Sequence, residues 1–222
     1  MSAPPQLWIK ICANTSLEDA QLAAEAGADA VGFVFAASPR RVRAAQVAAI
    51  TPSLPTGLEK IGIFVDATLD EICATVRDCG LTGVQLHSEA GPGVTAQLRV
   101  SFGAKLRILR VVHFGPDAAH HAVAVRADPN VDAILVDSRT ATAVGGTGVV
   151  FEWASARETL FRGIEARMVA AGGLTPENVV EAIATLRPWG VDVVTGVEMA
   201  PGRKDPRKVR DFIANARATD RP

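Results

Sequence analysis

A cysteine stands at the end of the first short apolar stretch of the chain. Across residues 7–12 apolar and other side chains alternate in the pattern of a β-strand, which places Lys10 and Cys12 on one face. Ser16 followed by Asp19 is typical of a helix N-terminus, so the backbone must turn directly after the cysteine. A thiol at the carboxyl end of a parallel strand is in position to line a ligand site. Taken alone, a cysteine is more often a small buried apolar residue.

A short internal repeat brings two further reactive side chains to equivalent positions. Its copies join a glycine or asparagine to an apolar run that contains Asp or Thr, and they begin at Gly27, Gly80, Asn130 and Gly190. Five residues beyond the shared Asp or Thr stand Val34, His87, Asp137 and Val197. The same rim therefore gains a histidine and an aspartate. The repeated acids themselves are expected to be structural residues that cap loops, namely Asp29, Asp132 and Asp192.

The elements that must position these residues alternate strictly between strand and helix. Strands are predicted near 7–12, 30–35, 59–65, 82–87, 106–112, 132–137, 166–170 and 191–195. Helices are predicted near 16–27, 43–51, 68–79, 93–102, 117–127, 152–162, 176–187 and 205–217. Eight such pairs predict a (βα)8 TIM barrel in the α/β class. We expect one domain over residues 1–222, with flexible tails at 1–6 and 218–222.

Glycine-rich turns follow the last strands and predict a phosphate site. The expected ligands are backbone amides in three clusters: Gly146, Thr147 and Gly148; Gly172 and Gly173; Thr195 and Gly196. One extra helical turn fits between residues 196 and 200, and Thr175 is predicted to cap the helix that starts at Pro176. Arg203 and Lys204 lie just past the last turn and are expected to contribute only screened surface charge.

The composition limits the partners of the protein. The net charge is −1 and 48% of the residues are hydrophobic, which argues against a nucleic-acid-binding surface. No apolar run is long enough to cross a membrane, and the N-terminus does not resemble a signal peptide, so a cytoplasmic protein is expected. The three cysteines lack metal-site spacing, which predicts reduced thiols and no metal site. Without an obvious apolar surface stripe, a monomer is favoured.

Motifs along nearly the whole chain resemble the phosphoribosylanthranilate isomerase family of tryptophan biosynthesis. They are Lys10-Ile11-Cys12, Leu17-Glu18-Asp19-Ala20, Gly32-Phe33-Val34-Phe35, Ser38-Pro39-Arg40-Arg41, Val84-Gln85-Leu86-His87, Asp137 before Gly145-Gly146-Thr147-Gly148, Ala171 to Val179, and Asp192 to Pro206. The resemblance implies an Amadori rearrangement of a phosphoribosyl substrate without cofactor or metal. It implies that Cys12 is the general base, Asp137 the general acid, and Arg41 the ligand of the anthranilate carboxylate. Lys10, whose charge would favour the thiolate, is expected to contact substrate. His87 is expected either to orient substrate or to be a hydrogen-bonded structural histidine of the rim.

The chain departs from the family pattern after the cysteine, where Ala13 and Asn14 replace a glycine and an aliphatic residue. If that turn needs a positive φ, Ala13 costs about 1 kcal/mol. Two alternative functions follow. One is the histidine-pathway isomerase or a dual-specificity enzyme, although that family carries aspartate in place of Cys12. The other is a barrel that binds a phosphate ester without converting it.

Overall fold

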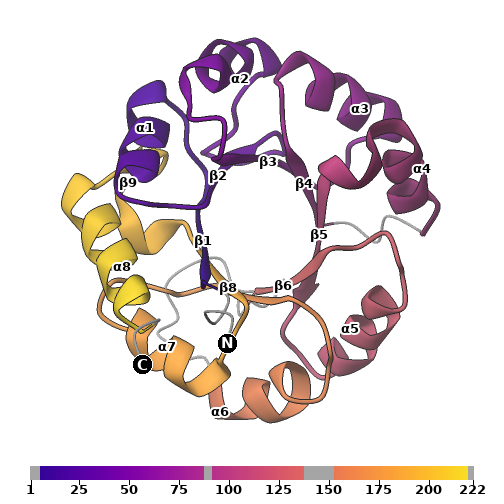
Figure 1. Cartoon of the computed structure of the whole chain (residues 1–222), viewed down its shortest axis with the longest axis vertical. Helices are drawn as coiled ribbons and strands as arrows, with labels where there is room; N and C mark the ends of the chain where they lie inside the picture. The colour runs from indigo at the N-terminus through magenta and orange to yellow at the C-terminus, as the bar shows by residue number, and fades with distance from the viewer. Residues whose placement is uncertain (1–5, 88–91, 138–152, 220–222) are drawn as a thin grey trace, which may run out of the picture.

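Eight parallel strands close into a barrel surrounded by helices (Figure 1). The computed structural model describes residues 6–87, 92–137 and 153–219. The strands are β1 (Trp8–Ile11), β2 (Ala30–Val34), β3 (Glu59–Phe64), β4 (Gly83–Leu86), β5 (Arg107–His113), β6 (Ala133–Asp137), β7 (Met168–Ala171) and β8 (Gly190–Val193). The helices are α1 (Leu17–Glu25), α2 (Ala44–Ile50), α3 (Leu69–Asp78), α4 (Pro92–Phe102), α5 (Ala118–Arg126), α6 (Trp153–Ala156), α7 (Val179–Leu186) and α8 (Pro206–Ala218). The predicted TIM barrel is confirmed.

Local capping signals fix where several helices begin. Ser16 accepts a hydrogen bond from the backbone of Asp19 at 3.1 Å, as predicted for the start of α1. Asp205 caps α8, and Pro206 takes its first position. The prediction for α7 was wrong by three residues, because Thr175 stabilises a turn and Asn178 occupies the N-cap position. The helix starts therefore follow short-range hydrogen bonds that the sequence only partly specifies.

The Asp and Thr residues of the internal repeat hold neighbouring strands together, except for Asp192. Asp29, Thr82 and Asp132 each precede a strand, and their side chains accept the backbone N–H of Ile9, Lys60 and Ile108 at 2.7, 2.8 and 2.7 Å. The structural interpretation is thus confirmed for Asp29 and Asp132. It was wrong for Asp192, because β8 begins at the first residue of its repeat, Gly190, instead of three residues later. That offset carries Asp192 into the strand, where its side chain is buried.

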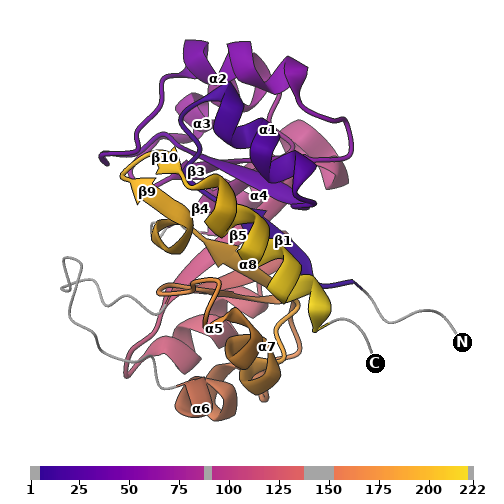
Figure 2. The same ribbon diagram turned by 90° about the vertical axis from the view of Figure 1, so that its left-hand side faces the viewer.

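The segment after β8 differs from the predicted extra helical turn. A single 3-10 turn spans Thr195–Val197, and β9 (Glu198–Ala200) then pairs antiparallel with β10 (Arg203–Lys204). Figure 2 shows this β9–β10 hairpin at the N-terminal end of α8, which runs beside α1 and β1. The hairpin therefore lies close to the turn that follows the cysteine.

The first and last parts of the chain complete the ring together. β1 pairs with β8 from Trp8↔Gly190 to Ile11↔Val193, and on its other side with β2. Arg217, near the end of α8, donates to the carbonyl of Leu7 and forms an ion pair of 2.6 Å with Asp29. Among the described residues, no helix combines the length and apolar character needed to cross a membrane.

Candidate active site

Cys12 follows β1 directly and is buried at the rim of the barrel. Its backbone N–H donates to Val193 at 2.9 Å, which ties the residue to β8. Its side chain is held in a tight space, since a Cβ atom added to Gly32 would lie 2.6 Å from the Cys12 Sγ atom. Gly32 in β2 is therefore the residue that makes room for the thiol.

The turn after Cys12 has a left-handed backbone, so the condition under which Ala13 is strained is met. Ala13 has φ of +63° and is almost completely buried. Asn14 fastens the turn, since its Nδ2 donates to the carbonyl of Ile11 at 2.8 Å and its backbone N–H donates to Gly32 at 2.9 Å. The positive φ costs an alanine about 1 kcal/mol relative to glycine, and the hydrogen bonds of Asn14 offset that strain.

Replacing Ala13→Gly is expected to raise the free energy of unfolding by about 0.5–1 kcal/mol, because glycine adopts this φ without steric strain. Urea unfolding followed by circular dichroism measures the change. Ala20→Gly in α1, a buried alanine in an ordinary helix, is the matched control and should lose stability. A loss of stability in Ala13→Gly as well would show that the turn is not strained.

Beneath the thiol, a chain of polar side chains crosses the interior of the barrel. Lys10 is fully buried, and its Nζ donates to Asp192 at 2.6 Å and to Gln85 at 2.9 Å. The Gln85 amide nitrogen lies 2.9 Å from His87 Nε2. Strands β1, β4 and β8 thus supply a continuous link from Asp192 to His87.

The direction of these bonds fixes a proton on His87. Lys10 can only donate, so the Gln85 oxygen accepts and the Gln85 amide group must donate to His87. His87 Nε2 is therefore an acceptor, and in the neutral ring the proton is carried by Nδ1. The ring centroid of His113 lies 6.0 Å away, at the end of β5.

Charges in this interior oppose one another at Cys12. Burial raises the pKa of the Cys12 thiol above its ordinary value; the positive charges of Lys10 and Lys204 act against this rise, and Asp192 adds to it. Burial lowers the pKa of Lys10, but Asp192 and Cys12 together raise it by a larger amount. The net pKa of Lys10 is therefore above its ordinary value. Lys10 thus stays an ammonium, and burial keeps the Cys12 thiol protonated at neutral pH.

Asp137 ends β6 on the same rim. It is buried, and it stands in register with His113 of β5 and Ala171 of β7. Its backbone carbonyl accepts the N–H of Phe114 at 2.9 Å, which holds the strand end in place. Asp137 and Cys12 therefore stand at the carboxyl ends of different strands, on one rim of the barrel.

The two adjacent arginines after β2 have different surroundings. Arg40 forms a two-pronged pair with Glu198, with Nε–Oε1 and Nη2–Oε2 distances of 2.9 and 2.7 Å. Arg41 is exposed and lines a cleft of about 490 Å³. Phe35 and Phe64 also line this cleft, and their rings stack with centroids 5.3 Å apart. Arg41 is consequently the arginine with access to a ligand.

Two of the three glycine clusters meet at the rim between β7 and β8. Gly172 and Gly173 have φ of +82° and +65°, values that favour glycine. Asn178 donates to the carbonyl of Gly173 at 3.0 Å and braces this loop. A Cβ on Gly196 would lie 1.9 Å from the carbonyl oxygen of Leu174, so Gly196 lets the two loops touch. Thr195 starts the short turn beside them, whereas Gly146, Thr147 and Gly148 lie outside the described residues.

Sequence reasoning missed several residues around the thiol. Asp192, Gln85, Gly32, Glu198 and Lys204 all contribute to its surroundings. Lys204 was expected to be a surface charge, but its side chain is completely buried. Spacing could have found Gln85, which is two residues before His87 and shares its face of the strand. Within the part of the chain that the structure describes, no cluster of acids, histidines and cysteines could hold a metal ion.

Comparison with known proteins identifies the family. Residues 9–215 match the family described as N-(5'phosphoribosyl)anthranilate (PRA) isomerase. The chain belongs to this family. The resemblance inferred from the sequence motifs is confirmed, and it extends over nearly the whole barrel.

Individual relatives agree with the family match. An N-(5'-phosphoribosyl)anthranilate isomerase of Geobacter sp. (strain M21) is 43% identical over 210 residues, which cover 94% of this chain and 97% of that protein. The solved enzyme of Thermotoga maritima superposes with a TM-score of 0.83 at 33% identity, covering 96% of this chain and all of that one. A phosphoribosyl anthranilate isomerase in complex with reduced 1-(o-carboxyphenylamino)-1-deoxyribulose 5-phosphate gives 0.80 at 31% identity, with 96% and 100% covered.

Proposed function

We propose that this chain converts N-(5'-phosphoribosyl)anthranilate into 1-(2-carboxyphenylamino)-1-deoxyribulose 5-phosphate, with Cys12 as general base and Asp137 as general acid. The observation that supports these roles is that both groups end strands, β1 and β6, at one mouth of a barrel of this family. Two proton transfers suffice for the rearrangement, so neither a metal nor a cofactor is needed.

The steps follow from the chemistry of the two groups. Asp137 gives its proton to the ribose ring oxygen, and the C1–O bond breaks as the anthranilate nitrogen forms an iminium. Cys12, as thiolate, then removes the proton from C2, and the electron pair moves to give an enolamine. The enolamine tautomerises to the ketone. General acid and base groups each contribute about 10²- to 10⁴-fold to such reactions.

The phosphate is proposed to bind where the loops after β7 and β8 meet. Backbone amides of Gly172, Gly173, Thr195 and Gly196 can surround an anion there without a side-chain cation. The two consecutive left-handed glycines, Gly172 and Gly173, turn the loop after β7 tightly. Gly146, Thr147 and Gly148 remain predicted ligands.

The anthranilate end is proposed to lie in the cleft lined by Arg41, Phe35 and Phe64. A guanidinium can bind both oxygens of a carboxylate, and the stacked phenyl rings offer an apolar wall to an aromatic ring. His87 and Lys10 are proposed to orient the sugar from the barrel interior. Gln85, which is hydrogen-bonded to both, links the two residues.

Arg41→Met is expected to raise KM for the substrate by about tenfold or more, the cost of a charge-assisted hydrogen bond, with a smaller change in kcat. Arg40→Met is the comparison. Because Arg40 is occupied by Glu198, its loss should lower stability and leave KM nearly unchanged. Steady-state kinetics and thermal melting of both variants measure these effects. Equal increases in KM would show that the β2 loop has been misinterpreted.

Turnover of the substrate tests the proposed function directly. The purified protein should convert N-(5'-phosphoribosyl)anthranilate with a change in anthranilate fluorescence, and it should do so after dialysis against a chelator. The aminoaldose phosphate of the histidine pathway is the comparison substrate, and equal turnover of both would establish dual specificity. Binding of the substrate without turnover would refute the enzyme assignment.

The protein is further proposed to act as a monomer. The large apolar side chains exposed in the described residues, Val100, Val123, Val180 and Met199, lie on four different elements. Each of these elements exposes one such side chain, whereas a stable dimer buries a large apolar area. Sedimentation equilibrium reports the mass, and a value twice that of the chain would refute this proposal.

A further inference from the structure

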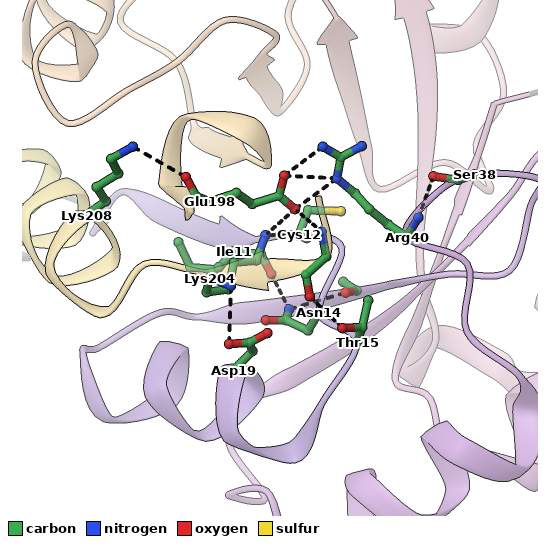
Figure 3. A network of polar contacts seen from close by, with 12 residues as sticks. Ile11, Cys12, Asn14, Thr15, Asp19, Ser38, Arg40, Glu198, Lys204 and Lys208 are labelled. Carbon is green, nitrogen blue, oxygen red and sulfur yellow. Dashed lines mark hydrogen bonds and ion pairs between the residues drawn. The ribbon is translucent and has the colours of Figure 1, made fainter. Parts of the chain in front are cut away.

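A completely buried lysine contacts the main chain of the cysteine. Lys204 lies in β10, and its Nζ donates to the carbonyl oxygen of Cys12 at 2.5 Å (Figure 3). Moving an ammonium group out of water costs several kcal/mol unless it is paired and hydrogen-bonded. The residue that receives this hydrogen bond is also the one just before the left-handed Ala13.

Glu198 holds the ammonium group in place. Its Oε1 lies 3.5 Å from Lys204 Nζ and accepts the backbone N–H of Gly202 at 3.2 Å. Arg40 binds the same carboxylate from the β2 side. Burial raises the pKa of Glu198, but Arg40 and Lys204 together lower it by a larger amount. The net pKa of Glu198 is therefore below its ordinary value. The carboxylate therefore stays charged between its two cations.

Other contacts attach the same hairpin to the turn after β1. Thr15 Oγ1 donates to the carbonyl of Gly202 at 2.6 Å, and the backbone N–H of Lys204 donates to Asp19 at 3.3 Å. A Cβ on Gly202 would approach Thr15 to 3.1 Å, so the two segments are closely packed. The turn that carries Cys12 is thus fixed from outside the barrel as well as by β2 and β8.

We propose that Lys204 is a positioning residue of the isomerisation, which fixes the main chain of Cys12 and places a positive charge beside its thiol. The proposal rests on the role of Cys12 as base. Glu198 acts through Lys204 by holding its ammonium group, and Arg40 in turn holds the Glu198 carboxylate. Lys204 thus joins the β9–β10 hairpin to the active site through the main chain of Cys12.

The charges around Cys12 give the direction of the expected effect. The ionisable groups that interact with the thiol are Lys10 on β1, Asp192 on β8 and Lys204 on β10. Lys10 and Lys204 both favour the thiolate, and of the two Lys204 also donates to the main chain of Cys12. Removing its charge should raise the pKa of Cys12 and move the alkaline rise of kcat/KM to higher pH.

Lys204→Met tests the proposal because it removes the ammonium group and keeps most of the stem. We expect kcat to fall tenfold to a hundredfold, the scale of a misplaced catalytic group, with KM changed less than about threefold. The titration of the Cys12 thiol should move up by about one pH unit or more. Thiolate absorbance, measured as the difference from a Cys12→Ser variant, reports that titration independently of turnover.

Two companion variants keep the test decisive. Glu198→Gln removes the negative countercharge and keeps the lysine, so it should move the thiol titration in the opposite direction, to lower pH, and it tests the charge of Lys204 if Lys204→Met does not fold. Arg203→Met, on the exposed side of the same hairpin, should change neither kcat nor the titration. An unshifted titration in a folded Lys204→Met, or an equal shift in Arg203→Met, overturns the proposal. Failure of the proposed function would instead appear as no turnover in the wild type.

Discussion

Cys12→Ser is expected to lower kcat by about 10²- to 10⁴-fold while the affinity for product changes little. A serine hydroxyl is far less acidic than a thiol, so it cannot supply the anion that removes the C2 proton. Serine is also smaller than cysteine, and it fits the space that Gly32 leaves at the rim. Steady-state kinetics give kcat, and titration with product gives the affinity, which should persist because the loss concerns the transition state.

The control for this variant is Cys73→Ala, which truncates a buried thiol on α3. It should lose stability and keep kcat. The pH profile of the wild-type protein adds a second readout. Because burial raises the pKa of Cys12, the wild-type kcat/KM should keep increasing with pH above neutrality. A near-normal kcat in Cys12→Ser would remove the thiol from the mechanism.

Asp137→Asn is expected to lower kcat by a similar factor. The amide has nearly the shape of the carboxyl group but cannot give a proton to the ribose ring oxygen, so ring opening loses its acid. The alkaline rise of kcat/KM that is assigned to Cys12 should remain in this variant, because the thiol is unchanged. Kinetics across a range of pH measure both.

Asp132→Asn provides the control, since Asp132 lies at the opposite end of β6. There it accepts the N–H of Ile108 and pairs with Arg99 at 2.8 Å. Its replacement should lower the melting temperature and leave kcat unchanged below that temperature. If Asp137→Asn retains more than about a tenth of the wild-type kcat, Asp137 is not the general acid.

Local sequence signals were sufficient for the barrel and for the ends of its strands. Alternation of strand and helix placed Cys12 after β1 and Asp137 at the end of β6, because both depend on short-range periodicity. Asp192 was misassigned because the pairing of Lys10 with it depends on the register between β1 and β8. Register in a closed barrel is set by the whole ring and not by either strand.

The burial of Lys204 could not be predicted for a different reason. Lysine and arginine look alike in a charged loop, and Arg203 beside it is indeed exposed. Which of the two turns inward depends on the antiparallel pairing of β9 with β10, and on the presence of Glu198 as a partner. The adjacent Arg40 and Arg41 differ for the same reason, since Glu198 occupies only one of them.

The joining of β1 to β8 also determines when a newly made chain can finish folding. Leu7 and its partner Arg217 are 210 positions apart. At about 5–20 residues per second, a ribosome needs roughly 10 to 40 s to make the segment between them. During that time β1 can pair with β2 alone, and its other edge has no partner strand. Closure of the ring therefore waits until β8 has been made, and the growing chain carries an open strand edge until then.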